Sequence, residues 1–395
     1  MKVVFIKKSV VAILLVVAMS GPEYSGCFAQ SPAKVVEDFK PSSVNQPGKE
    51  FPQVNSEGRV RIQILAPEAH KVQLDISAVK YDLVKDEKGV WTGESAPQDE
   101  GFHYYQLWVD GAAVPDPGSL YFYGASRWGS GIEIPAKDQD FYAMKNVPHG
   151  QVIELPYFSK SNNAMRRCFI YTPPGYDKDT NKRYPVLYVQ HGGGENETGW
   201  SSQGHANLIM DNLIAEGKAK SFIIVMDNGT WAMTGPRPAD RSAGTWPPKG
   251  WADSFMKTLL EEIIPMIDAN YRTVADQPHR AMAGLSMGGM QTRVITLAHP
   301  EVFSHVGIFS GGSITMEDLT NAPAFKEKNK LVFVSYGSRE LENPRAGFGG
   351  NPKENQDKLK EAGLNTHFYV SPQTAHEWQS WRRSLHDFAP LLFNN

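Results

Sequence analysis

Alternating hydrophobic and polar residues mark the region between residues 56 and 137. Apolar side chains recur there at every second position in short runs, which is the period of a strand with one buried face. The Asp110-Gly111 pair between two such runs is typical of a tight hairpin turn. Short strands at this spacing predict a small β-sandwich over residues 56–137. The alternating apolar positions are Val60, Ile62 and Ile64, then Val72, Leu74 and Ile76, then Tyr105, Leu107 and Val109.

A different pattern occupies residues 151–395, where continuous apolar runs of strand length alternate with longer amphipathic runs of helical period. Strands without polar positions are buried on both faces, so the pattern predicts an α/β fold, with a mainly parallel sheet covered by helices on both sides. Residues 30–55 and 138–150 show neither period and are expected to be a leader and a linker. The predicted strands cover 184–190, 221–228, 279–284, 305–311, 330–337 and 366–372, and the predicted helices cover 207–217, 254–271 and 355–363.

Residues 1–29 have the features of a signal peptide. Three lysines precede a ten-residue apolar run that is too short to cross a bilayer, and cleavage is expected after Ala29. The alternative is a lipoprotein anchored through Cys27, which Tyr24 disfavours because an aliphatic residue is usual at that place. We therefore expect a secreted or periplasmic protein without an integral membrane span.

Composition and charge argue against several classes of function. With 395 residues, 41% of them hydrophobic, and a formal net charge of −3, the chain shows no sign of binding nucleic acid or an anionic membrane. Removal of the signal peptide would leave one cysteine, Cys168, which is expected to be a small buried apolar residue. The sequence also lacks a P-loop, an H-E-x-x-H motif and a cysteine cluster, so we expect neither a metal nor an organic cofactor.

The segment AGLSMGGMQ at residues 283–291 carries the strongest chemical signal. It contains G-x-S-x-G centred on Ser286, a pattern typical of the strained strand-to-helix turn that presents a nucleophilic serine. A side chain at Gly284 or Gly288 would collide across so tight a bend. An apolar strand precedes the motif and a helix-like run follows it, so Ser286 is the candidate nucleophile.

A serine hydroxyl needs a base, and the base needs a carboxylate to orient it, in the chain order Ser, acid, His for this architecture. Glu340 follows one predicted strand and His376 follows the last one, so both are expected at the same end of the sheet as Ser286. Glu342, two residues beyond Glu340, is the alternative acid.

The tetrahedral intermediate of acyl transfer needs two backbone N–H donors for its oxyanion. Met287, directly after the candidate nucleophile, is expected to supply one. The HGGG run at residues 191–194 is expected to supply the other, with Gly193 preferred and Gly192 as the alternative. We expect His191 to bond to neighbouring backbone rather than to take part in chemistry.

Together these motifs resemble the esterase D-like branch of the α/β-hydrolases, in particular the carbohydrate esterase group that contains feruloyl and acetylxylan esterases. The upstream β-rich segments are similar to the immunoglobulin-like early-set domain that precedes the esterase in many members. The resemblance implies an α/β-hydrolase fold preceded by a small immunoglobulin-like sandwich, with Ser286 as nucleophile, Glu340 as acid and His376 as base. Its segments are 59–76, 85–119, 191–200, 206–229, 284–289, 336–340 and 375–388.

The resemblance also implies a secreted serine esterase that removes acyl groups from plant cell-wall xylan, so that a polysaccharide or oligosaccharide ester is its partner. The tryptophans of the loop at residues 229–251 lead us to expect feruloyl groups as the main substrate and acetyl groups as a secondary one. This loop is long and rich in proline and glycine. We expect its three tryptophans to contact the planar acyl group or its sugar; the alternative is that they pin the loop to the domain. They are Trp231, Trp246 and Trp251.

Other functions stay open from the sequence. The same fold could cleave acetylxylan, a siderophore or another small ester, or the protein could be an inactive glycan-binding protein. Four aromatic residues of the predicted sandwich could stack on sugars, although positions at strand spacing favour a core or an interface. They are Trp91, Tyr104, Tyr105 and Trp108.

Overall fold

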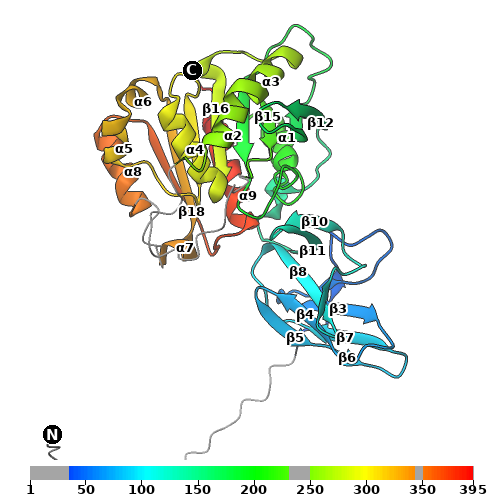
Figure 1. Cartoon of the computed structure of the whole chain (residues 1–395). Coiled ribbons are helices and arrows are strands. Elements are labelled where there is room, and N and C mark those ends of the chain that lie inside the picture. The colour runs from blue at the N-terminus through cyan, green and yellow to red at the C-terminus, as the bar shows by residue number, and fades with distance from the viewer. Residues whose placement is uncertain (1–34, 231–249, 343–349, 395) are drawn as a thin grey trace, which may run out of the picture. The chain divides into compact units, whose positions relative to one another are not determined.

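Two antiparallel sheets form the first folded region of the chain, which we call the all-β region (Figure 1). A computed structural model describes residues 35–230, 250–342 and 350–394 of the protein, so the predicted signal peptide with Cys27 lies outside the described residues. The strands are β1 Lys40–Pro41, β2 Gln53–Val54, β3 Val60–Leu65, β4 Val72–Ile76, β5 Val79–Asp82, β6 Val84–Lys85, β7 Val90–Glu94, β8 Gly101–Val109, β9 Ala112–Val114, β10 Tyr121–Gly124 and β11 Arg127–Ile134. One sheet has the order β1-β2-β3-β7-β6 and the other β10-β11-β8-β4-β5, with β9 paired to β8.

The core of the all-β region lies between its two sheets. Val60 of β3 and Leu74 of β4 are fully buried in one cluster with side chains from both sheets. Because successive residues of a strand point to opposite faces, the alternating apolar positions turn inward. The β8–β9 hairpin forms as predicted, since Asp110 and Gly111 both have positive φ. The prediction of a small all-β sandwich is confirmed.

The all-β region begins before its expected start at residue 56, whereas its last strand, β11, ends at Ile134, close to the expected end at residue 137. Strand β1 pairs with β2, and β2 pairs with β3, so the sheet starts at Lys40 and residues 40–55 are not a linker. Residues 138–150 contain the 3-10 helix η1 (Gln139–Tyr142), whose Tyr142 is buried in the core of the next region. Strands of two residues and a single helical turn are too short to show a period, and only their tertiary partners hold them in place.

An eight-stranded sheet forms the second region, which we call the α/β region. Its order is β12-β13-β15-β14-β16-β17-β18-β19, antiparallel at β12 and β13 and parallel from β15 onward. The strands are β12 Gln151–Ser159, β13 Ala164–Thr172, β14 Val186–Gln190, β15 Ile223–Asp227, β16 Arg280–Leu285, β17 His305–Phe309, β18 Leu331–Gly337 and β19 Thr366–Ser371. Each predicted strand is therefore present, and the α/β-hydrolase fold class is confirmed.

Helices cover both faces of this sheet (Figure 1). They are α1 Ala206–Ala215, α2 Asp253–Thr258, the π-helical turn η2 Leu259–Ile263, α3 Ile264–Asn270, the 3-10 turn η3 Gln277–His279, α4 Met287–Ala298, α5 Met316–Asn321, α6 Pro323–Lys328, α7 Ser338–Glu342, α8 Pro352–Glu361, α9 Trp378–Phe388 and the 3-10 turn η4 Ala389–Leu391. No helix in the described part of the chain is long and apolar enough to cross a bilayer.

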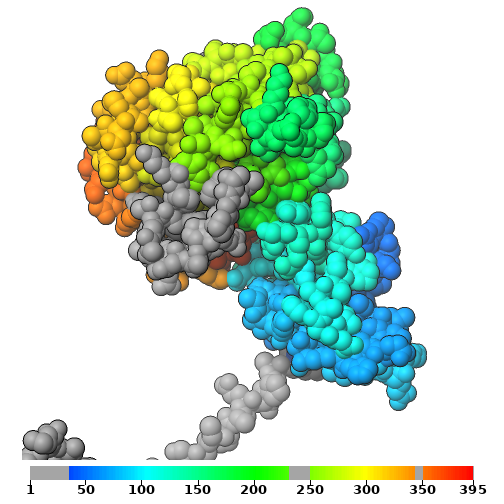
Figure 2. Space-filling view, in the orientation of Figure 1, coloured from blue at the N-terminus to red at the C-terminus, as the bar shows by residue number. Residues whose placement is uncertain are grey.

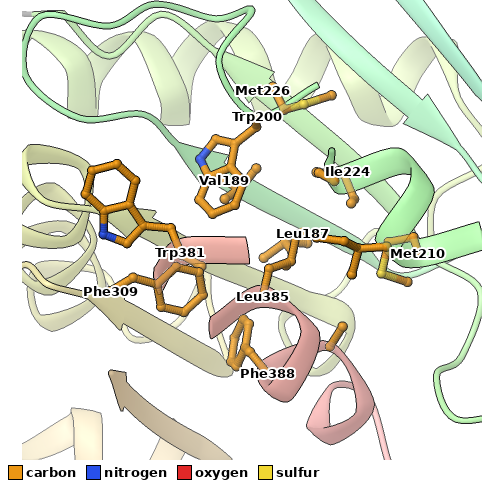
Figure 3. Close-up of a cluster of buried hydrophobic side chains, with 14 of the residues drawn as sticks. Leu187, Val189, Trp200, Met210, Ile224, Met226, Phe309, Trp381, Leu385 and Phe388 are labelled. Carbon is orange, nitrogen blue, oxygen red and sulfur yellow. The ribbon is translucent and has the colours of Figure 1, made fainter. Parts of the chain in front are cut away.

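The central strands are buried on both sides, as their continuous apolar runs predict. Leu187 and Val189 of β14 pack with α1 and α9 in the cluster that Figure 3 shows, whereas Val186 and Tyr188 of the same strand pack with α2 and α3. Strand β13 adds Cys168, which is buried as expected, and burial raises the pKa of its thiol. The loops at the carboxyl edge of the sheet thus extend from strands that are packed on both faces.

A buried ion pair joins the two regions. Arg382 of α9 donates from Nη1 and Nη2 to the two carboxylate oxygens of Glu133 in β11, over 2.6 and 3.0 Å, and its side chain is 0% exposed. Its Nε donates to the backbone oxygen of Gln203 over 2.7 Å. Burial alone would raise the pKa of Glu133, but the charge and hydrogen bonds of Arg382 lower it below its ordinary value.

Glu133→Gln is expected to lower the free energy of unfolding by about 3–5 kcal/mol, because Arg382 would keep its charge in a buried site without a carboxylate. The folded-state pKa of Glu133 lies below its ordinary 4.5, so the stabilisation is present above that pH and is lost as the pH falls through the folded value. Urea denaturation at pH 7, and then at decreasing pH, measures both effects. The control is Asp357→Asn, which removes the exposed Lys353 ion pair and should cost under about 1 kcal/mol.

Candidate active site

The carboxyl ends of the parallel strands meet at one edge of the α/β sheet. Gln190 of β14 pairs with Gly284 of β16, and Leu285 of β16 pairs with Phe309 of β17. The last residues of β18 and β19 are also paired with each other. The loops that follow these strands are therefore neighbours, and they contain the candidate nucleophile, acid, base and oxyanion donors.

Ser286 occupies a sharp turn between β16 and α4. Its φ is 52° and its ψ is −115°, an uncommon conformation for a residue with a side chain, and its backbone N–H donates to the oxygen of Phe309 over 2.8 Å. A Cβ at Gly284 would lie 2.3 Å from the backbone of Gly288, and one at Gly288 would lie 2.6 Å from the oxygen of His191. The glycines are thus required by close backbone contacts, which agrees with the steric argument from the motif.

One hydrogen-bonded chain connects the three candidate catalytic side chains. Nε2 of His376 lies 2.9 Å from Oγ of Ser286, and its Nδ1 lies 2.7 Å from Oε1 of Glu340. Glu340 sits in α7 and His376 in the loop between β19 and α9. The alternative acid, Glu342, is exposed at the end of α7. The structure therefore brings together the preferred three residues.

Glu340 is held as a carboxylate by its surroundings. Its Oε2 accepts hydrogen bonds from the hydroxyl of Ser310, over 2.7 Å, and from the backbone N–H of Gly337, over 2.8 Å. Burial alone would raise the pKa of Glu340, but the hydrogen bond and charge of His376, together with these donors, lower it below its ordinary value. An ionised acid at this position can support a protonated His376.

Sequence reasoning missed two residues that position the acid and the base. Nε1 of Trp381 donates to the hydroxyl of Ser310 over 3.1 Å, and the Trp381 ring packs edge-on to the His376 ring with centroids 5.1 Å apart. Ser310 directly follows β17, and its φ of 50° places it in a tight turn. The one sequence signal for Ser310 was its position directly after β17, the strand that pairs with β16, which leads into the turn at Ser286.

Of the expected oxyanion donors, Met287 and the alternative donor Gly192 lie beside Ser286. Met287 is the first residue of α4, where a backbone N–H has no partner within the helix. A Cβ at Gly192 would lie 2.6 Å from the Leu285 side chain and 3.4 Å from Cβ of Ser286, whereas Gly193 is exposed with open space around it. The glycine run thus passes directly next to the nucleophile, and Gly193 is the member that faces open space.

His191 is a structural residue of the same loop. The backbone N–H of Gly229 donates to its Nε2 over 3.1 Å, so its Nδ1 carries the proton and donates to the oxygen of Gly192 over 2.8 Å. Burial lowers its pKa, which favours this neutral form. The bonding to neighbouring backbone agrees with the expectation from the sequence.

The predicted substrate contacts are only partly described. Trp231 and Trp246 lie outside the described residues. Trp251 is 7% exposed, so its ring is packed against the protein, as in the alternative interpretation that it pins the loop. Among the residues that the structure describes, no group of His, Cys, Asp or Glu side chains could hold a metal ion.

The aromatic residues of the all-β region are in cores or interfaces. Trp91 and Tyr105 are buried in the sandwich core. Trp108 is half-buried and donates from Nε1 to Asp75, while Tyr104 packs against the core of the α/β region. Their surroundings match the favoured interpretation of these four positions.

Comparison with known proteins identifies a family and a close relative. The model of a family described as "Putative esterase" matches residues 159–392. An endo-1,4-beta-xylanase/feruloyl esterase of Xylanibacter ruminicola is 46% identical over 368 residues, covering 91% of this chain and 48% of that protein. The chain therefore spans about half the length of this relative.

Solved structures share the fold. A CE1 ferulic acid esterase from Anaeromyces mucronatus, in complex with ferulic acid, has a TM-score of 0.53 at 23% identity, with 65% of this chain and 96% of that chain covered. An enterochelin esterase from Shigella flexneri has a TM-score of 0.60 at 16% identity, with 87% of this chain and 94% of that chain covered. At these identities the likeness concerns the fold.

Proposed function

This chain belongs to the esterase family, and from that premise we propose that it is a serine carboxylic ester hydrolase with Ser286 as nucleophile, His376 as base and Glu340 as acid. The observation that carries the proposal is the hydrogen-bonded chain of 2.9 and 2.7 Å through these side chains, next to a glycine loop and a helix N-terminus. Acyl transfer requires a nucleophile, a base, an acid and oxyanion donors close together, and this arrangement meets that requirement.

In the first half of the reaction, Oγ of Ser286 attacks the acyl carbonyl carbon while Nε2 of His376 takes the hydroxyl proton. The resulting tetrahedral oxyanion accepts hydrogen bonds from the backbone N–H groups of Met287 and Gly193. The intermediate collapses, the ester C–O bond breaks, and His376 returns its proton to the leaving alcohol. The product is an acyl-serine.

In the second half, His376 takes a proton from water, which attacks the acyl-serine through the same oxyanion geometry. Collapse then releases the carboxylic acid, and the proton returns to Oγ of Ser286. Glu340 stays ionised throughout: it orients the imidazole and stabilises its positive charge. Ser310 and Gly337 serve this role by keeping the Glu340 carboxylate fixed.

The substrate class we propose is a feruloyl ester on plant cell-wall xylan, with acetyl esters as secondary substrates. The 46% identical relative carries feruloyl esterase in its name and matches 91% of this chain, which supports this choice. Trp231 and Trp246 remain our candidates for contacts to the acyl group or the sugar, whereas the burial of Trp251 favours a role in holding its loop. The proposal includes export through the signal peptide, since xylan is an extracellular polymer.

We expect methyl ferulate and feruloylated arabino-oligosaccharide to be hydrolysed with a higher kcat/KM than acetylated xylan. The physical reason is that a planar aromatic acyl group gains stacking of about 0.5–1.5 kcal/mol for each good aromatic contact, which an acetyl group cannot make. Initial rates on the three substrates, measured by release of acid, test it. Efficient xylan deacetylation without ferulate release would overturn the feruloyl assignment.

An inactive glycan-binding protein is the competing function. A serine-directed fluorophosphonate separates the two, because it reacts only with a serine that a neighbouring base activates. Labelling that disappears in Ser286→Ala supports the esterase. An unlabelled, folded wild-type protein that retains xylan would support the binding protein, and hydrolysis of a catecholate siderophore ester alone would redirect the substrate class.

A further inference from the structure

The turn between β10 and β11 touches the glycine loop of the candidate active site. Ala125 and Ser126 form this turn with φ of 50° and 64°, and the backbone N–H of Ser126 donates to the oxygen of Gly194 over 2.7 Å. In the space-filling view, cyan side chains of this part of the all-β region lie against green side chains of the α/β region (Figure 2). Two segments that are distant in the sequence are thus joined through their backbones.

The contact requires a glycine at position 194. Gly194 has a φ of 81°, a conformation that side chains rarely adopt, and a Cβ there would lie 3.3 Å from both the backbone nitrogen and Oγ of Ser126. Gly194, the third glycine of HGGG, therefore leaves room for the turn at Ala125 and Ser126. Gly192, at the other end of the run, lies against Ser286.

Tyr104 of β8 makes a second connection to the same loop. Its hydroxyl donates to Oε1 of Glu195 over 3.0 Å and accepts from Nε2 of Gln203 over 2.6 Å. It also accepts from Nε1 of Trp378, two residues after His376, over 3.1 Å. One hydroxyl from the all-β region thus links the residue that follows the glycine run to the helix that follows the candidate base.

Glu195 is a buried carboxyl that the proposed reaction does not use. Its Oε2 is buried without a hydrogen-bond partner among the described residues. Burial raises its pKa to about 8, which favours the neutral carboxyl at pH 7. The geometry of its contact with Tyr104, rather than a charge, is therefore what Glu195 has to offer the adjoining backbone.

We propose that the all-β region positions the oxyanion hole. Tyr104 acts through Glu195, and Ser126 acts through Gly194. Together they hold the backbone that follows Gly193 and so keep the Gly193 N–H within hydrogen-bonding distance of the oxyanion that forms at Ser286. This inference rests on the proposed function. A glycine run has high backbone freedom and would not keep one geometry by itself. Oxyanion donors act only when they lie about 2.7–3.1 Å from the developing charge, so their support must come from fixed neighbours.

Tyr104→Phe tests this by removing one hydroxyl and leaving the ring. On p-nitrophenyl acetate we expect kcat to fall about ten- to hundredfold with little change in KM, because the hydrogen bond to Glu195 supports a geometry that only the transition state uses. The inhibition constant of a trifluoromethyl ketone, whose serine adduct places an oxyanion in the hole, should rise by a similar factor. The dissociation constant of ferulic acid should stay unchanged.

Tyr105→Phe is the matched control. Tyr105 is the next residue of β8 and is buried in the sandwich core, where its hydroxyl donates to Asp116 over 2.8 Å. Removal of this hydroxyl should lower thermal stability without changing kcat or the inhibition constant. A decrease in kcat of the same size in Tyr105→Phe would overturn the proposal, because stability alone would then explain the effect.

Glu195 supplies a second pair of variants. Glu195→Gln keeps an uncharged acceptor for Tyr104 and should retain most of the wild-type kcat, whereas Glu195→Ala should lower kcat as much as Tyr104→Phe. The double variant Tyr104→Phe/Glu195→Ala should be little worse than either single one. If the wild-type protein shows no turnover, the proposed function fails and this inference fails with it. If the wild type is active but Tyr104→Phe and Glu195→Ala leave kcat and the inhibition constant unchanged, only this inference is overturned.

Discussion

Ser286→Ala is expected to reduce ester hydrolysis by about 10⁶-fold while the protein stays folded. The hydroxyl forms the covalent acyl intermediate, and its Oγ is the group that Nε2 of His376 reaches at 2.9 Å. Burst and steady-state kinetics on an aryl ester, with circular dichroism to check folding, measure the effect. Activity above a hundredth of the wild-type value would remove Ser286 from the mechanism.

His376→Ala should be comparably severe, and the double variant with Ser286→Ala should be little worse, because the members of such a set act as a unit. The controls are Ser56→Ala, at an exposed position in the all-β region, and His299→Ala, at the end of α4. Both should retain wild-type kcat. A control variant as inactive as His376→Ala would show that the decrease does not report on the hydrogen-bonded chain.

Glu340→Gln is expected to lower kcat by about 10³- to 10⁴-fold, by analogy with the amide substitution in the serine-protease triad. The neutral amide cannot stabilise the charged imidazole as the carboxylate does, and if its NH2 group faces Nδ1, now 2.7 Å from Glu340, it donates there and favours the wrong tautomer. Steady-state rates at pH 7 measure the change, and KM should move little.

Glu342→Gln is the matched control for the acid. Its side chain is exposed, two residues along the same short helix, and its replacement should be nearly silent. If Glu342→Gln were the severe variant and Glu340→Gln the silent one, the acid assignment would be wrong and the contact between Glu340 and His376 would have no catalytic meaning.

Short-range features of the sequence were sufficient for the architecture and for the nucleophile turn. The period-two run around Val60 and the continuous run around Leu187 predict which faces are buried, because side-chain direction depends only on local backbone geometry. The turn at Ser286 follows from Gly284 and Gly288, which meet within five residues. The order of strands along the chain places the candidate acid and base at the same sheet edge.

Features that depend on partners distant in the chain were not predictable. Strands β1 and β2 have two residues each and exist because β3 pairs with β2, which in turn pairs with β1. The length, composition and strand-end position of residues 229–251 leave Trp251 either in contact with substrate or pinning its loop, and its 7% exposure depends on how the surrounding segments pack. Neither the two-residue strands nor the burial of Trp251 produces a periodic pattern of apolar residues in the sequence.

The choice of acid illustrates where the sequence stops. By itself the sequence determined the fold class, the strained turn at Ser286 and two candidate acids two residues apart. Only the tertiary structure decided that Glu340 faces His376, because residues two apart on a helical turn point in different directions and the turn's orientation depends on packing. The same holds for the hydrogen bond of Ser310 to Glu340, between loops that follow two strands of the sheet, and for the contact of Tyr104 with Glu195 across 91 residues, since each joins segments that are distant in the sequence.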